Sequence, residues 1–152
     1  MSTRKMNRLR LILWLALLAS LGFAAWATLR PFDWKPDPQA GCHLSSAHIR
    51  KDHSYYWLDL HVKINAGASH QLEIPVVMKL ADGKSLDPAD ITFVSRDKGP
   101  IEEIFLKFWL AEDQIHGPLN LKINQGLLRV KSTHAAPAIE NGKTRALPTH
   151  RW

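Results

Sequence analysis

One uncharged stretch constrains this chain more than any other feature. Residues 11–29, LILWLALLASLGFAAWATL, contain no charged side chain. As a helix rising about 1.5 Å per residue, the stretch is about 28 Å long, close to the ~30 Å of bilayer hydrocarbon. Trp14 and Trp26 lie toward its ends, where interfacial aromatic residues gather. We therefore expect Leu11–Leu29 to be a transmembrane anchor or a signal peptide.

The charges on either side of this stretch predict its orientation. Residues 1–10 carry four basic residues and no acidic one, whereas the two basic residues that follow the stretch are offset by two acidic ones. The positive-inside rule places the N-terminus in the cytoplasm and everything after Leu29 outside. The expected location is a bacterial inner membrane, with one span and a periplasmic C-terminal domain.

Retention and cleavage of the leader both remain open. The sequence Ala25-Trp26-Ala27 fits the small-x-small pattern that a signal peptidase accepts, which predicts a cut after Ala27. However, the apolar run is longer than the usual ~7–15 residues of a signal peptide, and no polar stretch precedes the candidate cut. These features favour a retained anchor, and both interpretations export the rest of the chain.

The remaining sequence divides by composition. Residues 30–39 hold three prolines and read as an extended spacer. Residues 40–132 contain eleven Lys/Arg and eleven Asp/Glu, a net charge of zero, whereas residues 133–152 contain three basic residues against one acidic residue. The basic excess therefore lies outside the foldable part, which argues against a nucleic-acid-binding domain. The last segment has no apolar period and is predicted to be a disordered basic tail.

Residues 40–132 show the two-residue period of β-strands. In SYYWLDLHVKI, one face is apolar and the other mixes aromatic and polar residues. A helix is a rival interpretation for 101–111, but its aromatic density favours a strand. Asp87-Pro88 is predicted to start a single helical turn. Six to seven short strands separated by turns predict an antiparallel β-sandwich, with strands at 54–64, 70–80, 91–95, 101–111, 119–124 and 127–132.

Three segments carry a family resemblance. YYWLDLHVKIN is a long alternating strand, LADGKSLDPAD ends a strand in an Asp-Gly turn, and FLKFWLAEDQIHGPLNLKI joins two late strands through Gly-Pro. Over residues 53–131 this order resembles the small immunoglobulin-like domains that follow signal peptides, lipoprotein anchors or single helices in bacterial cell-envelope proteins of unknown function. The resemblance implies an immunoglobulin-like fold and an extracytoplasmic compartment, and it implies no catalytic residue.

A partner-binding surface is the main functional prediction. Aromatic side chains on a solvated strand face often mark protein contacts. We expect the contact surface to comprise Tyr55, Trp57, Asp59, His61 and Lys63, with Trp109 and Phe105 near them. The partner is expected to be another envelope protein. The alternative is that a neighbouring segment covers these rings.

The eight histidines suggest a second function. Copper and zinc favour imidazole and thiolate ligands, so an exported metal-handling domain is the alternative, with ligands among Cys42, His43, His48, His53 and His61. The five-residue spacing of three of these histidines suits neither one helix face nor one strand face. Solvated histidines are therefore the favoured interpretation, and no cofactor is predicted.

Motifs for catalysis are missing from the sequence. The chain holds no G-x-S-x-G elbow and no phosphate-binding glycine loop, and Glu102 and Glu103 alternate across a strand rather than forming an acid–base pair. Cys42 lacks the apolar neighbour expected of a lipidation site. We therefore expect a membrane-anchored, extracytoplasmic binding module that is not an enzyme.

Overall fold

The computed structural model describes residues 3–28, 32 and 36–152, which fall into two units, Met1–Arg30 and Pro31–Trp152. The first unit contains helix α1 (Thr3–Thr28). Its segment Arg8–Trp26 is exposed, and it is long and apolar enough to cross a membrane. The predicted end of the span at Leu29 and most of the predicted spacer lie outside the described residues.

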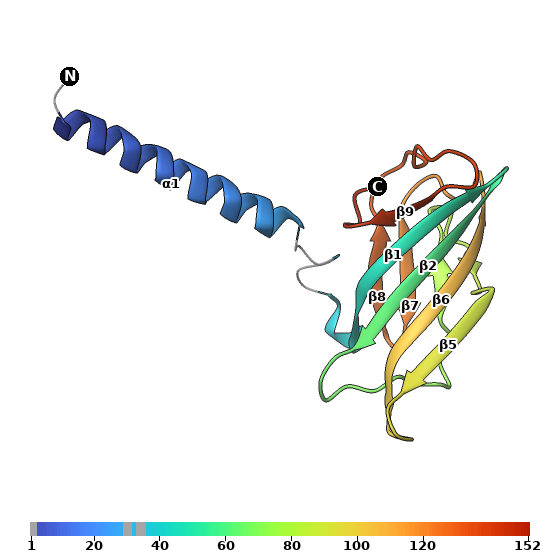
Figure 1. Cartoon of the computed structure of the whole chain (residues 1–152). Helices are drawn as coiled ribbons and strands as arrows, with labels where there is room; N and C mark the ends of the chain where they lie inside the picture. Colours follow the sequence, from blue (N-terminus) through green and yellow to red (C-terminus); the bar gives the residue numbers. More distant parts are fainter. Residues whose placement is uncertain (1–2, 29–31, 33–35) are drawn as a thin grey trace. The chain divides into compact units, whose positions relative to one another are not determined.

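The second unit is mainly β and contains two antiparallel sheets (Figure 1). A five-stranded sheet has the order β5-β6-β2-β1-β9, and a four-stranded sheet has the order β4-β3-β7-β8. The elements are η1 (Pro38–Ala40), β1 (Cys42–Asp52), β2 (Tyr55–Ile64), β3 (Val77–Lys79), β4 (Ser85–Leu86), β5 (Asp90–Ser95), β6 (Ile101–Ala111), β7 (Leu119–Ile123), β8 (Gly126–Lys131) and β9 (Thr144–Leu147).

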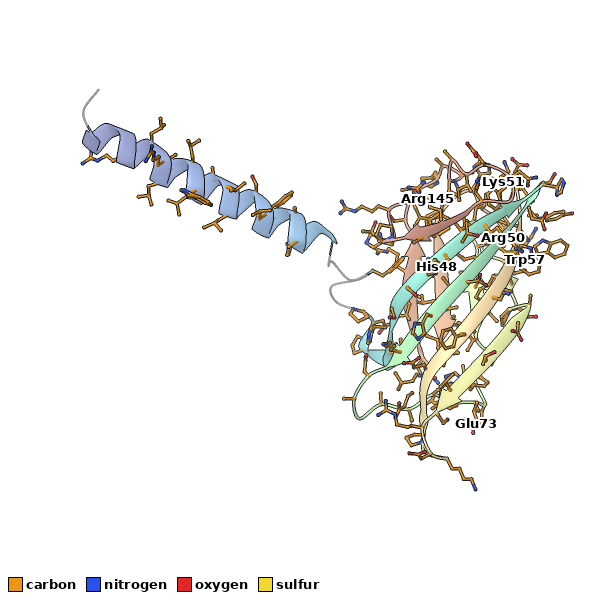
Figure 2. The ribbon with its side chains drawn as sticks, viewed as in Figure 1. His48, Arg50, Lys51, Trp57, Glu73 and Arg145 are labelled. Atoms are coloured by element: carbon orange, nitrogen blue, oxygen red, sulfur yellow. The ribbon has the colours of Figure 1, made fainter. Side chains whose placement is uncertain are left out.

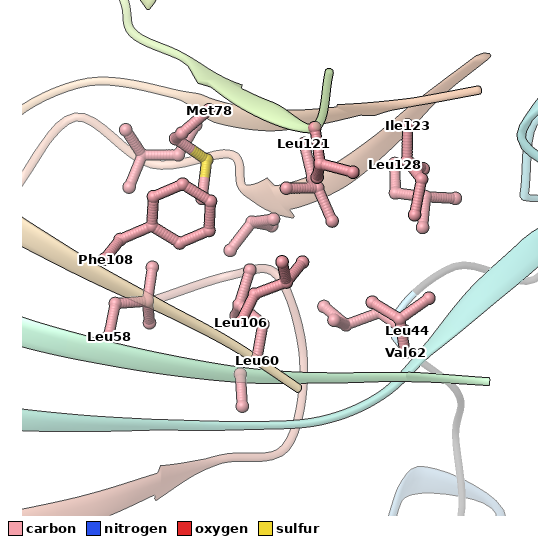
Figure 3. Close-up of a cluster of buried hydrophobic side chains, with 14 of the residues drawn as sticks. Leu44, Leu58, Leu60, Val62, Met78, Leu106, Phe108, Leu121, Ile123 and Leu128 are labelled. Atoms are coloured by element: carbon pink, nitrogen blue, oxygen red, sulfur yellow. The ribbon is translucent and has the colours of Figure 1, made fainter. Parts of the chain in front are cut away.

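Side chains from both sheets meet in a shared apolar core (Figure 3). Alternate residues of β2 and β6 enter the core from the larger sheet, because successive side chains of a strand point to opposite faces. The smaller sheet contributes from β3, β7 and β8. The labelled members in Figure 3 are Leu44, Leu58, Leu60, Val62, Leu106 and Phe108 from one sheet and Met78, Leu121, Ile123 and Leu128 from the other.

Most of the predicted strands are confirmed. The strictly alternating segments form β2, β5, β6, β7 and β8, and β7 and β8 pair as the expected hairpin. The segment 101–111 is a strand and not a helix. It lies between β5 and β2, so it is an internal strand of the five-stranded sheet. One row of its bulky side chains enters the core, whereas the other, which includes Phe105 and Trp109, faces outward and stays partly exposed.

The strand predicted over 70–80 is wrong over most of its length. Only Val77–Lys79 forms a strand, and Leu72 is 65% exposed instead of facing the core. Pro75 lacks the N–H that a sheet ladder requires. The Gln71 backbone N–H is bound instead by a side chain, as described below. The helical turn expected at Asp87-Pro88 is also not formed, because these residues connect β4 to β5 without helical structure.

The C-terminal segment is held to the sheets, so the prediction of a disordered tail over 133–152 is wrong. β9 pairs antiparallel with β1, and its Leu147 is buried. Beyond β9, the backbone N–H of Ser132 donates to the carbonyl oxygen of His150 over 2.7 Å. The folded unit therefore extends past its predicted end at residue 132.

This C-terminal segment encloses a lysine. Lys131 is fully buried, and its Nζ donates to the carbonyl oxygens of Gly117, at 3.1 Å, and Thr133, at 2.6 Å. The ammonium lies 5.5 Å from the ring centroid of Trp152, whose indole N–H donates to the Val130 carbonyl over 2.9 Å. Burial lowers the pKa of Lys131 because it disfavours the charged form.

A buried asparagine joins three separate segments. Asn124 lies in the β7–β8 turn with a φ of 50°. Its Oδ1 accepts from the backbone of Gln71, at 2.8 Å, and from the ring of His70, at 2.9 Å. Its Nδ2 donates to the carbonyl oxygens of Ala40, at 2.6 Å, and Ser69, at 3.2 Å. One amide thus fixes both the entry of the chain into β1 and the loop between β2 and β3.

Candidate functional site

The outer face of the five-stranded sheet carries the residues predicted to bind a partner. Every second residue of β2 is buried, so the intervening side chains point away from the core. β6 lies beside β2 and places Trp109 opposite Trp57. One continuous face therefore brings together Tyr55, Trp57, Asp59, His61, Lys63 and Trp109.

Three of these rings form an aromatic cluster, defined here as Tyr55, Trp57 and Trp109. The centroids of Tyr55 and Trp109 are 4.5 Å apart, and the two indoles are 6.1 Å apart with an interplanar angle of 20°. Tyr55 remains 41% exposed and Trp109 48% exposed. The rings pack on one another, Trp57 is half-buried, and the exposure of Tyr55 and Trp109 favours an open surface over the alternative of a covering segment.

A second aromatic contact lies further along the same two strands. The rings of His61 and Phe105 are stacked, with centroids 4.3 Å apart and an interplanar angle of 5°. His61 Nε2 is 3.0 Å from a carboxylate oxygen of Glu103, which orients the imidazole over Phe105. Sequence reasoning placed Phe105 near this surface but missed Glu103, because the pairing of β2 with β6 is a long-range contact.

Charges of both signs separate the rings. Lys107 Nζ lies 3.8 Å from an Asp59 carboxylate oxygen and 5.9 Å from the centroid of the Trp57 ring. Lys63 Nζ lies 3.8 Å from Glu103. Two carboxylates and two ammonium groups thus leave this part of the face without net charge. A shallow hollow of about 250 Å³ opens beside them, lined mainly by Asp59, Asp90, Phe105 and Lys107.

β1 borders this face and was not predicted as a strand. Its ladder with β2 shifts register between Leu44 and Ser46, which marks a β-bulge. The bulge breaks the two-residue period of CHLSSAHIRKD, so the alternation that reveals a strand is lost. The shift also brings His43 and His48 to the same outer face despite their spacing of five, opposite Lys63 and Asp59.

The far end of β1 adds a polar border to the aromatic cluster. Arg50 lies opposite Trp57, and Figure 2 shows both of them with His48 on the same side of the sheet. Asp52 accepts hydrogen bonds from the side chains of His53 and Trp57, which lower the pKa of its carboxyl. The carboxylate therefore stays ionised and helps to fix the orientation of the Trp57 indole.

The alternative metal site is not assembled. Cys42 points into the core, and burial raises the pKa of its thiol to about 12, so the thiolate that a metal requires is not available. His43 is bound to Asn65 at 2.7 Å and His53 to its neighbour Asp52 at 2.9 Å. Within the described residues, no group of three His, Cys, Asp or Glu side chains is placed to hold a metal ion.

Comparison with known proteins does not add a family. No family model matches the chain, and no curated protein or solved structure matches it. The features of the chain that bear on function are therefore its own: one apolar N-terminal helix, a two-sheet β unit, and an exposed face on which aromatic side chains alternate with charges of both signs.

Proposed function

We propose that the protein is a membrane-anchored binding module of the bacterial cell envelope. In this proposal α1 is retained as a single span, the N-terminus is cytoplasmic, and the β unit is an immunoglobulin-like sandwich in the periplasm. The basic residues before the apolar stretch support this orientation. The two antiparallel sheets with a common core support the sandwich. The module acts by binding and not by catalysis.

The exposed aromatic cluster is the observation that carries the binding role. Tryptophan and tyrosine are enriched among the residues that dominate protein–protein binding energy. A monomeric domain rarely leaves such rings contiguous and solvated, because burying them in an interface is favourable. Here they are partly exposed, held in place by cross-strand contacts, and bordered by polar groups that suit an interface rim.

The charges on this face indicate a protein partner. Nucleic acid and anionic lipid surfaces both select a concentrated positive charge. The face instead alternates Lys63 and Lys107 with Asp59 and Glu103. Such balanced pairs suit a protein surface that carries both signs. We therefore propose that the partner is another envelope protein with an extracytoplasmic domain.

The anchor strengthens this binding without adding a contact. Confinement to the same membrane raises the effective concentration of the two proteins, so a modest intrinsic affinity is sufficient. The chain enters the sheet at the start of β1, whereas the aromatic cluster lies beside the opposite end of that strand.

Retention of the anchor is tested by mass and extraction. The protein is expressed in a bacterial host, the membranes are washed with carbonate, and the intact mass is measured. We expect a full-length mass in the membrane pellet. A mass beginning at Thr28 in the soluble periplasmic fraction would show cleavage after Ala27, and the tethered part of the proposal would be abandoned.

The docking surface is tested by site-specific photocrosslinking in membranes. A photoreactive amino acid replaces Trp109, and in a matched control it replaces Leu127, an exposed apolar residue of the other sheet. We expect Trp109 to yield a crosslink to one envelope protein that Leu127 does not yield. The purified partner must then bind the wild-type chain and lose binding to Trp57→Ser. Equal crosslinking from both positions, or unchanged binding by Trp57→Ser, would refute the surface.

A further inference from the structure

The four edges of the two sheets differ in how they are protected. An open edge exposes unpaired backbone groups that can recruit another strand, so natural domains shorten, charge or cover their edges. β4 has only two residues. β9 has four, includes Arg145, and is followed by Pro148.

The edge strand β8 is covered by specific hydrogen bonds. The Leu127 N–H donates to the carboxylate of Asp37 over 3.1 Å. The Val130 carbonyl accepts from the Trp152 indole, and the Ser132 N–H just after the strand donates to His150. Two outward backbone groups of β8 and one just after it are thus bound by segments that lie before and after the sheet.

The edge strand β5 is less protected: its one charge is Asp90 at the first position, and one ring from outside the sheet, that of His70, stacks on Phe93 with the centroids 5.5 Å apart. It is the outermost strand of the larger sheet in Figure 1, and its six residues pair only with β6. Residues 91–95 are Ile-Thr-Phe-Val-Ser, with no charge and no proline. Phe93 and Val94 are 41% and 40% exposed. Among the hydrogen bonds of the described residues, none reaches residues 90–95 from any segment except β6.

The sequence of β5 suits antiparallel pairing with the same strand of a second copy of the chain. In an antiparallel pair centred on Phe93, each Phe93 faces its counterpart, and Thr92 faces Val94. Asp90 of each copy then faces Arg96 of the other, so two opposite-charge pairs close the two ends. Directly opposed residues of antiparallel strands share one face of the sheet, so the pairing keeps the inner and outer faces of both copies aligned.

The charged ends are available for such a pairing. Asp90 forms no ion pair within the described part of the chain, although it lines the shallow hollow next to Lys107. Arg96 contacts a carboxylate oxygen of Glu102 at 3.2 Å, and both side chains are exposed. A guanidinium carries five donors, so a second carboxylate can be bound beside the first.

We propose that β5 is a homodimerisation strand, which pairs antiparallel with β5 of a second copy of this chain about a two-fold axis at Phe93. The pairing joins the two five-stranded sheets into one continuous sheet. It also places two aromatic clusters on a single extended outer face. The inference does not depend on the partner proposed above, because it rests on the edge and not on the face.

Disulfide trapping tests this pairing in the full-length chain in membranes. Residues that meet at a two-fold axis need only one cysteine, so Phe93→Cys is oxidised with a mild added oxidant and separated under non-reducing conditions. The native Cys42 stays unreacted because it is buried with a pKa of about 12. Ala146→Cys, on the other edge of the same sheet, is the matched control.

The expected result is a disulfide-linked homodimer with Phe93→Cys and not with Ala146→Cys. The register is tested with two singly substituted chains, Thr92→Cys and Val94→Cys, which should crosslink more strongly when mixed than either does alone. Equal yields from both edges, no dimer from Phe93→Cys, or a crosslink from Phe93→Cys to a different protein would overturn the proposal.

Charge reversal provides an independent test without cysteine. Asp90→Arg and Arg96→Asp each replace two attractive pairs by two repulsive pairs, so we expect either change to weaken dimerisation roughly tenfold. The double variant Asp90→Arg/Arg96→Asp restores opposite charges and should recover the dimer. Arg145→Glu is the control for net charge. Light scattering of the full chain in detergent measures the fraction of dimer, and a double variant no better than the single ones would contradict the pairing.

Discussion

The two sheets of the β unit differ in what surrounds them. One edge and the turn of the smaller sheet are bound by other segments of the chain: Asp37 and Trp152 bind the edge of β8, the C-terminal segment buries Lys131, and Asn124 ties the β7–β8 turn to two loops. The larger sheet leaves its aromatic outer face and its β5 edge in solvent. The polar groups around the smaller sheet are thus bound within the chain, whereas those on the outer face of the larger sheet remain accessible to a partner.

This difference predicts that residues around the smaller sheet mainly determine stability, whereas residues on the outer face of the larger sheet mainly determine binding. A buried donor or acceptor that loses its partner costs roughly 1–3 kcal/mol, so substitutions around the smaller sheet should lower the free energy of unfolding. Exposed side chains contribute less to folding because water replaces their contacts. We therefore expect substitutions on the outer face of the larger sheet to affect binding more than unfolding.

The largest effect is expected at Asn124. Asn124→Ala removes four hydrogen bonds to two other segments and places a Cβ-only side chain at a positive φ, so unfolding should become easier by about 2–4 kcal/mol. Chemical denaturation of the full chain in mild detergent, followed by circular dichroism, measures the change. Asn120→Ala, on the half-exposed face of β7, is the control and should cost less than 1 kcal/mol, about the limit for surface substitutions.

The next largest effect is expected at Trp152. Trp152→Ala removes the donor to the Val130 carbonyl and uncovers Lys131, which should lower the free energy of unfolding by about 1–3 kcal/mol. The same denaturation experiment measures it. Trp152→Phe keeps a ring over the lysine but not the indole donor, so its value should fall between those of wild type and Trp152→Ala. Equal stability of all three proteins would show that the C-terminal segment does not secure the smaller sheet.

These interactions of the smaller sheet were the part that sequence reasoning could not predict. Alternation identified β2, β6, β7 and β8 because each buries one face along its whole length. It failed for β1, where a bulge interrupts the period, and for β9, which has only one buried residue. It overpredicted 70–80, where the apolar period is real but Pro75 and the Asn124 amide hold the backbone out of a ladder.

The candidate site shows the same limit. Because successive side chains of a strand alternate between its faces, a spacing of two residues was enough to place Trp57, Asp59 and His61 on one face of β2. That β6 lies next to β2, with Trp109 opposite Trp57 and Glu103 bound to His61, depends on pairing between segments more than 40 residues apart. Local pattern predicts which face a side chain occupies, whereas the register between distant strands decides which side chains meet.

A smaller, pH-dependent effect is expected at His70. Burial lowers the pKa of His70, although its hydrogen bond to Asn124 opposes the shift. The unfolded chain therefore binds a proton more readily than the folded one just below the usual histidine value of about 6.5, so stability should fall as the pH drops through that range. His70→Gln removes the titrating imidazole and with it this pH dependence of stability. A series of denaturation curves from pH 7.5 to about 5 should have a shallower slope for His70→Gln, and identical slopes would exclude the contribution.

The smallest effect on stability is expected where the effect on binding is largest. Trp109→Ser removes an exposed ring that contacts Tyr55 and Trp57 across the strand, so it should cost less than about 1 kcal/mol of unfolding free energy. The same variant should weaken partner binding at least tenfold, because aromatic residues at the centre of an interface carry much of its energy. Leu127→Ser, of similar exposure on the smaller sheet, should leave binding unchanged. A large loss of stability in Trp109→Ser with unchanged partner binding would contradict this contrast. It would show that the outer face of the larger sheet contributes to stability as the contacts around the smaller sheet do. A loss of binding with an intact fold would instead show that the outer face of the larger sheet serves binding, whereas the contacts around the smaller sheet serve stability.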